Sequence, residues 1–197
     1  VLSDEAYFEM RFGGKSKSIA QLPGMIDRTV ILYTFSKKFA MTGWRLGAAI
    51  APLELANNIS KLNTNDESCT THFVQYGGVE AITGDQSHVP VMLNTLKERR
   101  DVAVELLNKM PGVSVHSPNA GFYLFPDVTE AMQRKGFTEL ADFAQDALHK
   151  TGVSFCTRLH FGRPQNDEKR KYIRLAFSGI NKDQIEEGLG LMGKWIA

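Results

Sequence analysis

The stretch TFSKKFAMTGWRLG, residues 34–47, carries the strongest chemical signal in this sequence. It places Lys37 directly after an apolar segment and Arg45 eight residues later, between Gly43 and Gly47. A lysine in a partly desolvated pocket near other cations has a lowered pKa, and its neutral amine can attack a carbonyl. Arginine presents planar donors that suit a phosphate. The stretch therefore predicts a site for a phosphorylated aldehyde, although a pair of lysines beyond a strand is more often surface charge.

Two hydroxyls and two glycines accompany these cations. Thr34 and Ser36 can add hydrogen bonds to the same phosphate. Gly43 and Gly47 permit close approach of the backbone or unusual backbone dihedrals. An amine for an aldehyde and a guanidinium for a phosphate together predict a pyridoxal 5'-phosphate site.

The segments on either side of this stretch alternate between apolar runs and helical patterns. Residues 29–36 are nearly continuous in apolar character, which predicts a strand buried on both faces of a mainly parallel sheet. Residues 46–52 predict a second strand, and residues 53–63 and 70–83 predict helices. The opening VLSDEAY, residues 1–7, resembles the end of a strand that runs into a functional loop.

The pattern of expected helices and strands changes near residue 90. This change divides the chain into an α/β part, residues 1–90, and an α+β part, residues 91–197. A long helix begins at Pro90 and ends before Pro111 and Gly112. Asn181 and Gln184 have the spacing of a capping box and start the last helix. The remaining elements expected in this part are strands at 113–116, 121–126, 153–156 and 172–177 and a helix at 138–150.

Composition excludes several functional classes. The 197 residues carry 23 Lys+Arg against 22 Asp+Glu without a run of like charges, which argues against a nucleic-acid partner. No stretch approaches the length of a membrane span, and the five histidines show no metal-ligand spacing. Cys69 and Cys156 are far apart, so we expect buried, unpaired thiols and a cytoplasmic location.

The stretch at residues 34–47 closely resembles the cofactor-lysine signature of class I/II aminotransferases, which are fold type I pyridoxal-phosphate enzymes. It is most similar to the aspartate, alanine, aromatic and kynurenine aminotransferases. The resemblance implies that Lys37, and not Lys38, forms the Schiff base with the cofactor, and that Arg45 binds its phosphate. It also implies the fold: part of the large α/β domain followed by the C-terminal α+β small domain.

Two further segments resemble this family. Asp4-Glu5-Ala6-Tyr7 is similar to its D-x-x-Y element, which implies that Asp4 pairs with the pyridine nitrogen and that Tyr7 donates to the phenolic oxygen of the cofactor. YIRLAFS, residues 172–178, resembles the late strand whose arginine binds the substrate α-carboxylate, which implies this role for Arg174. The arginines of the preceding loop are expected to be solvated; they are Arg158, Arg163 and Arg170.

The resemblance implies an aminotransferase that exchanges an amino group between an amino acid and a 2-oxo acid, in a homodimer. It covers about the C-terminal half of a typical family member. We therefore expect the chain to be a fragment that is inactive alone. Three alternatives stay open at this point. The protein can be a carbon–sulfur lyase or a cyclopropane-forming synthase of the same fold, a non-enzymatic effector domain, or a structural remnant.

Overall fold

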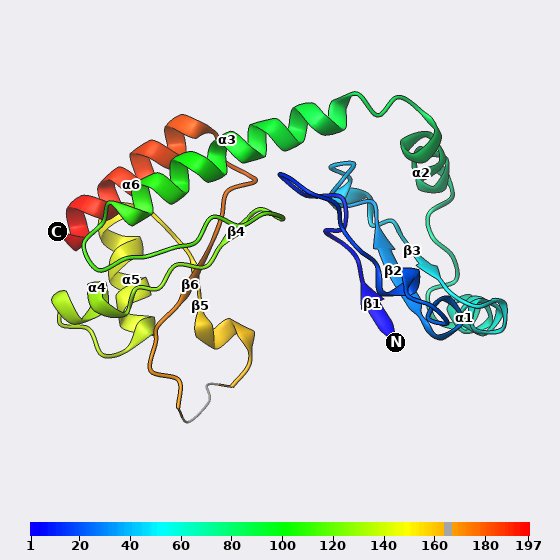
Figure 1. Ribbon diagram of the computed structural model, residues 1–197, viewed down its shortest axis with the longest axis horizontal. Helices are drawn as coiled ribbons and strands as arrows, with labels where there is room; N and C mark the ends of the chain where they lie inside the picture. The colour runs from blue at the N-terminus through cyan, green and yellow to red at the C-terminus, as the bar shows by residue number, and fades with distance from the viewer. Residues whose placement is uncertain (164–166) are drawn as a thin grey trace. The chain divides into compact units, whose positions relative to one another are not determined.

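The computed structural model describes residues 1–163 and 167–197. The chain divides into two compact units, residues 1–93 and residues 94–197, which we call unit 1 and unit 2 (Figure 1). Their extents are close to the predicted parts 1–90 and 91–197. The assignment of these parts as a portion of a large domain and a small domain stays a prediction.

Unit 1 contains a three-stranded sheet with the order β1-β2-β3 (Figure 1). β1 is parallel to β2, with Leu2 opposite Val30 and Asp4 opposite Leu32. β3 is antiparallel to β2, which differs from the mainly parallel sheet expected. All three strands form where the sequence predicts them, but they are shorter: β1 (Leu2–Asp4), β2 (Val30–Thr34) and β3 (Gly47–Ile50).

The expectation that residues 29–36 are buried on both faces is wrong in this chain. Leu32 of β2 is 37% exposed, and every residue of β3 is exposed. The buried cluster of unit 1 lies beyond the strand and consists of Phe35, Met41 and Leu46 with Val74. β2 therefore has more apolar surface than the other elements of unit 1 cover.

The helical elements of unit 1 follow the predicted ranges. Val74 and Gly78 are buried on one face of α2, whereas Phe73 and Tyr76 are exposed, so this helix is apolar on two sides. No helix in the described part of the chain is long and apolar enough to cross a membrane. The elements are η1 (Ile19–Gln21), η2 (Ile26–Arg28), η3 (Thr42–Trp44), α1 (Leu53–Asp66), α2 (His72–Thr83) and α3 (His88–Asn108), the last of which continues into unit 2.

Unit 2 contains a second three-stranded sheet, with the order β4-β6-β5 and antiparallel pairing throughout. Strands form within the predicted ranges 121–126 and 172–177, again shorter than expected, whereas the strand predicted at 153–156 forms at Cys156–Thr157. The fourth, at 113–116, is reduced to an isolated bridge between Ser114 and Asp127. Pro126 has no backbone N–H to donate, which limits the length of the strand predicted at 121–126. The bounds are β4 (Tyr123–Leu124), β5 (Cys156–Thr157) and β6 (Ile173–Ala176).

The helices of unit 2 confirm the predicted capping box. The Asn181 side chain accepts the Gln184 N–H at 2.9 Å, and the Gln184 side chain accepts the Asn181 N–H at 3.0 Å. A short helix at 129–134 escaped prediction because six residues hold too few turns to show a period. The elements are α4 (Thr129–Arg134), α5 (Leu140–Thr151), η4 (Arg158–Phe161) and α6 (Lys182–Ile196).

The core of unit 2 joins α5 to α6. Phe143 of α5 is fully buried, and its ring centroid lies 4.9 Å from that of Trp195 in α6. The indole N–H of Trp195 donates to Asp146 at 3.0 Å, so the aromatic contact keeps its one polar atom satisfied. The predicted apolar stripe of the last helix is buried; it consists of Ile185, Leu189, Met192 and Ile196.

Both cysteines are free thiols, but they are not the buried small residues that the sequence suggested. Cys69 is exposed, because it lies in the connection between α1 and α2, outside the buried cluster. Cys156 is partly exposed and lies in β5.

A glycine fixes the turn that follows α3. Gly112 has a φ of +75°, in the left-handed region that favours glycine. A Cβ atom at this position would lie 2.6 Å from the backbone nitrogen of Ala131. That nitrogen donates to the Gly112 carbonyl at 3.1 Å, so this turn and α4 are held in close contact.

We expect Gly112→Ala to lower the free energy of unfolding by about 3 kcal/mol, because left-handed strain and a backbone clash add together. Gly136→Ala is the matched control: Gly136 has a φ of +76°, but nothing lies within 4 Å of the position that its Cβ atom would take. Strain alone should cost the control about 1 kcal/mol. Chemical denaturation measures both; equal losses would show that the contact with α4 does not constrain the turn.

Candidate active site

The predicted cofactor residues lie at one edge of the sheet of unit 1. Asp4 ends β1 and Thr34 ends β2, and these two strands are parallel neighbours. Tyr7 follows the first strand and Lys37 follows the second. The carboxyl ends of parallel strands are where α/β sheets bind their ligands.

Lys37 and Tyr7 meet although 30 positions separate them in the sequence. The Lys37 ammonium lies 5.5 Å from the centroid of the Tyr7 ring, and both side chains are partly buried. An amine is therefore held beside a phenol on two adjacent loops. The Lys37 carbonyl accepts the N–H of Ala40 at 3.3 Å, which turns the chain sharply after the lysine.

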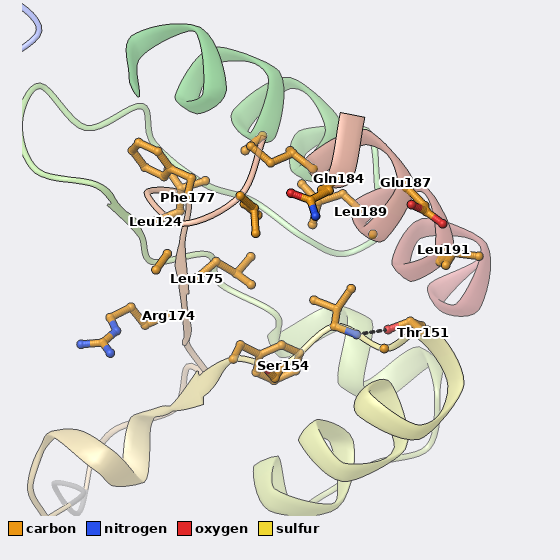
Figure 2. A pocket seen from close by; sticks show the side chains of 18 of the residues that line it. Leu124, Thr151, Ser154, Arg174, Leu175, Phe177, Gln184, Glu187, Leu189 and Leu191 are labelled. Atoms are coloured by element: carbon orange, nitrogen blue, oxygen red, sulfur yellow. Dashed lines mark hydrogen bonds between the residues drawn. The ribbon is translucent and has the colours of Figure 1, made fainter. Parts of the chain in front are cut away.

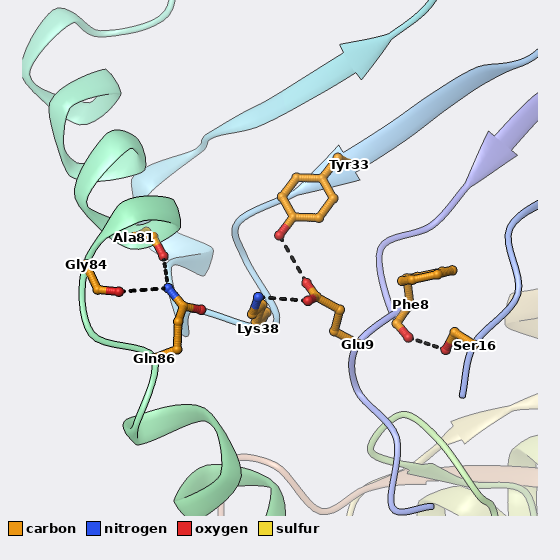
Figure 3. A network of polar contacts seen from close by, with 8 residues as sticks. All are labelled: Phe8, Glu9, Ser16, Tyr33, Lys38, Ala81, Gly84 and Gln86. Carbon is orange, nitrogen blue, oxygen red and sulfur yellow. Dashed lines mark hydrogen bonds and ion pairs between the residues drawn. The ribbon is translucent and has the colours of Figure 1, made fainter. Parts of the chain in front are cut away.

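Lys38 lies in a different polar network, drawn in Figure 3. Its ammonium forms an ion pair with Glu9 at 2.7 Å and lies 4.9 Å from the centroid of the Phe39 ring. The other carboxylate oxygen of Glu9 accepts the hydroxyl of Tyr33 at 3.2 Å. Burial, reinforced by the charge of Glu9 and by this hydrogen bond, raises the pKa of Tyr33 to about 12.

The hydroxyls and the guanidinium expected to bind phosphate lie at the end of β2 and in the loop that follows it. Thr34 accepts the N–H of Ser36 at 3.2 Å through its hydroxyl, and Ser36 is buried. The carbonyl of Ser36 accepts the hydroxyl of Thr42 at 3.0 Å. Arg45 is exposed and donates one N–H to the Thr42 carbonyl at 2.9 Å. This segment thus carries Thr34, Ser36 and Arg45 on a framework of its own hydrogen bonds.

The same loop has an unusual backbone. Ala40 and Arg45 have φ values of 53° and 55°, and only one other non-glycine residue in the described chain, Ser68, has a positive φ. Such strain concentrates at functional sites. Of the two possibilities considered for Gly43 and Gly47, unusual dihedrals are not found, because neither residue has a positive φ. Gly47 does permit close approach, since a Cβ there would lie 3.0 Å from the Tyr33 carbonyl.

Asp4 remains open to a cationic group. Its side chain is exposed and accepts the N–H of Ala6 at 3.2 Å, and it forms no ion pair with the described residues of unit 1. An amine, a guanidinium, two hydroxyls, a phenol and a carboxylate thus belong to adjacent loops. This donor set fits a phosphorylated aldehyde whose ring nitrogen carries a proton.

Arg174 belongs to unit 2, in the central strand β6. Cys156 of β5 lies directly opposite, and its sulfur accepts an N–H from the guanidinium at 3.3 Å. The guanidinium carbon lies 4.5 Å from the ring centroid of Tyr123 and 4.9 Å from that of Phe161. Sequence analysis missed these three neighbours, although the alternation of β4 and β6 places Tyr123 on the face of Arg174.

The loop arginines differ from one another. Arg163 and Arg170 are exposed as expected, the latter 3.4 Å from Asp127. The expectation that Arg158 is solvated is wrong, because it pairs with Glu168 at 2.8 Å and each side chain is only 20% exposed. Arg158 also donates to the carbonyls of Phe161 and Gly162, so it fastens the turn η4.

Unit 2 also contains a cavity of about 640 Å³ between β6, α6 and the connection from α5 to β5 (Figure 2). Its lining is mainly apolar and includes Leu175, Phe177 and Leu189. Arg174 also lines this cavity, but in Figure 2 its guanidinium points away from the other labelled side chains.

Comparison with known proteins identifies the family of this chain. The family model "Aminotransferase class I and II" matches residues 1–190. An asparagine–oxo-acid transaminase from Streptococcus mutans is 36% identical over 180 residues, which cover 90% of this chain and 44% of that protein. An aspartate aminotransferase from Musicola paradisiaca is 34% identical over 180 residues, 91% of this chain and 43% of that protein.

A solved structure gives the same result for the fold. The aromatic aminotransferase from Pyrococcus horikoshii superposes with a TM-score of 0.87 and 29% identity, over 99% of this chain and 50% of that one. The chain spans about half the length of the relatives it matches, and it has the fold of the corresponding part of a fold type I pyridoxal-phosphate enzyme. By its matching family model and by these relatives, the chain belongs to the class I and II aminotransferases.

Proposed function

We propose that the protein containing this chain is a pyridoxal-phosphate-dependent aminotransferase that moves an amino group between an amino acid and a 2-oxo acid. The observation that carries the proposal is the pairing of β1 with β2, which brings Lys37 beside Tyr7 at one edge of the sheet. The named relatives are aminotransferases, and no observation favours a carbon–sulfur lyase, a synthase or an effector domain.

The family resemblance implies a role for each residue, and the chemistry of each side chain suits that role. Bound pyridoxal phosphate supplies a ring that takes up electrons from the α-carbon of the substrate. Lys37 would offer the amine that bonds to the aldehyde carbon with release of water. Once the amino group of the substrate displaces it from that carbon, the freed Nζ would move the proton of the α-carbon. Asp4 holds the proton on the ring nitrogen, and Tyr7 donates to the phenolic oxygen. Arg45, with Thr34 and Ser36, binds the phosphate.

The substrate and assembly complete the proposal. Arg174 binds the α-carboxylate through two parallel N–H donors, which fixes the orientation of the amino acid. We further propose a cytoplasmic homodimer, for which the family and the unpaired cysteines are the support.

Lys37→Ala should abolish covalent retention of the cofactor in the complete protein, because the variant lacks the amine that bonds to the aldehyde. Lys38→Ala is the matched control and should retain the cofactor, since Lys38 is bound to Glu9. Borohydride reduction followed by peptide mass spectrometry locates the attachment. Retention in Lys37→Ala together with loss in Lys38→Ala would transfer the role to Lys38.

The two arginines should separate cofactor binding from substrate binding. Arg45→Ala should weaken the affinity for pyridoxal phosphate by about ten- to a hundredfold, the worth of charge-assisted hydrogen bonds. Arg174→Lys should leave that affinity unchanged and raise the KM for the amino acid by a similar factor. Cofactor titration and steady-state kinetics over a panel of amino acids measure the two effects; the reverse pattern would contradict both roles.

The network that holds Lys38 should be visible in the pH dependence of stability. The folded-state pKa of Tyr33, about 12, exceeds its ordinary value of 10.0. A raised pKa contributes stability that is complete below the unfolded value and is lost as the pH rises through the folded value. We therefore expect the free energy of unfolding to fall between about pH 10 and pH 12, and Tyr33→Phe to reduce that fall.

In Tyr33→Phe the free energy of unfolding still changes with pH because of lysines and other tyrosines. This remaining slope is the internal reference. Glu9→Gln should lower the pKa of Tyr33, although burial keeps it above the ordinary value. Denaturation at several pH values and phenolate absorbance follow the two changes. Identical slopes in the parent and in Tyr33→Phe would show that folding does not raise the pKa of this hydroxyl.

A further inference from the structure

Arg174 is held in place without an acidic partner. Among the described residues of unit 2, several arginines form ion pairs, as Arg158 does with Glu168 and Arg170 with Asp127. Arg174 forms none there, and its hydrogen bond goes to the sulfur of Cys156, a weak acceptor. The side chain is nevertheless partly buried. A positive charge in such a position needs another kind of stabilisation.

Two aromatic rings supply that stabilisation. The guanidinium carbon lies within 5 Å of the ring centroids of Tyr123 and Phe161, inside the range of cation–π attraction. This attraction acts through the ring faces and occupies none of the five N–H donors of the guanidinium. The rings therefore restrain Arg174 and leave its planar donors available for a carboxylate.

The two rings are themselves fixed by the fold. Tyr123 lies in β4, where it pairs with Ala176 and is the diagonal neighbour of Arg174 on the same face. Phe161 ends the turn η4, and the carbonyls of Phe161 and of the following Gly162 accept from Arg158. The ion pair of Arg158 with Glu168 anchors this turn. Phe161 itself is 43% exposed, so its position depends on the turn that these contacts of Arg158 hold.

We propose that Tyr123 and Phe161 are positioning residues, whose rings hold the Arg174 guanidinium ready for the substrate α-carboxylate. The role rests on the proposed aminotransferase function. An unrestrained arginine side chain would lose the conformational entropy of several rotatable bonds when it binds a carboxylate. Restraint before binding removes part of that loss, so it strengthens substrate binding and leaves proton transfer at Lys37 unaffected.

The first experiment compares kinetics in the complete protein with its cofactor. Phe161→Leu and Tyr123→Leu should each raise the KM for the amino acid about five- to tenfold, the worth of one cation–π contact, with kcat within about twofold. Phe161→Tyr and Tyr123→Phe keep the rings, so each should have the KM of the parent protein. Phe137→Leu removes a ring that contacts Phe143 and Trp195 instead, and should leave the KM unchanged.

A double variant separates positioning from general structural damage. If Phe161 acts only through Arg174, adding Phe161→Leu to Arg174→Lys should raise the KM by less than about twofold beyond Arg174→Lys alone. If the KM of the double variant equals the product of the two single effects, the residues act independently and the proposal is overturned. Single leucine variants whose KM stays within about twofold of the parent would also overturn it, as would ring-preserving variants that do not keep the KM of the parent.

A second measurement does not depend on activity. With labelled arginine, NMR reports whether rotation about the Cζ–Nε bond of Arg174 is slow enough to give separate signals for its terminal nitrogens. We expect separate signals in the parent and merged signals in Phe161→Leu, whereas Phe137→Leu should resemble the parent. Merged signals in the parent would overturn the positioning role. Separate signals in a protein without transaminase activity would contradict only the proposed function.

Discussion

The parallel pairing of β1 with β2 is the constraint on which the candidate site depends. Backbone hydrogen bonds extend it at both ends, from Val30 N to Val1 O at 2.9 Å and from Glu5 N to Leu32 O at 3.0 Å. Because successive side chains of a strand alternate between faces, a slip of one residue would turn Asp4 to the opposite face. The register therefore decides whether the loop with Tyr7 reaches the loop with Lys37.

The loop from Lys37 to Arg45 combines local strain with strong anchoring. Left-handed conformations at Ala40 and Arg45 each cost about 1–2 kcal/mol in a residue with a Cβ. The strained positions alternate with buried apolar ones, since Met41 and Leu46 pack with Phe35 in the core of unit 1. Burying such side chains offsets the strain. The exposed arginine thus obtains a fixed backbone from apolar neighbours that have no chemical role.

The sequence predicted those features that are local in the chain. Asn181 and Gln184 lie one helical turn apart, and the apolar run before Ser36 forms a strand because its residue types favour one. Contacts between distant segments could not be predicted. Glu9 and Lys38 are 29 positions apart, and Cys156 and Arg174 are 18 apart. Such pairs depend on strand register and loop path, which a hydrophobic pattern does not specify.

The partners of the charged groups distinguish structural roles from binding roles. Lys38 and Arg158 have carboxylate partners, so their charges are compensated within the protein and they fasten loops. Arg174, by contrast, is restrained by rings and a thiol that leave its charge uncompensated. Removing a charge from water without a counter-charge is unfavourable, so the attraction of the rings and the partial exposure of the side chain together permit the charge to persist. A ligand carboxylate would provide the compensation, and this makes an arginine held by aromatic rings a better candidate for substrate binding than one already paired.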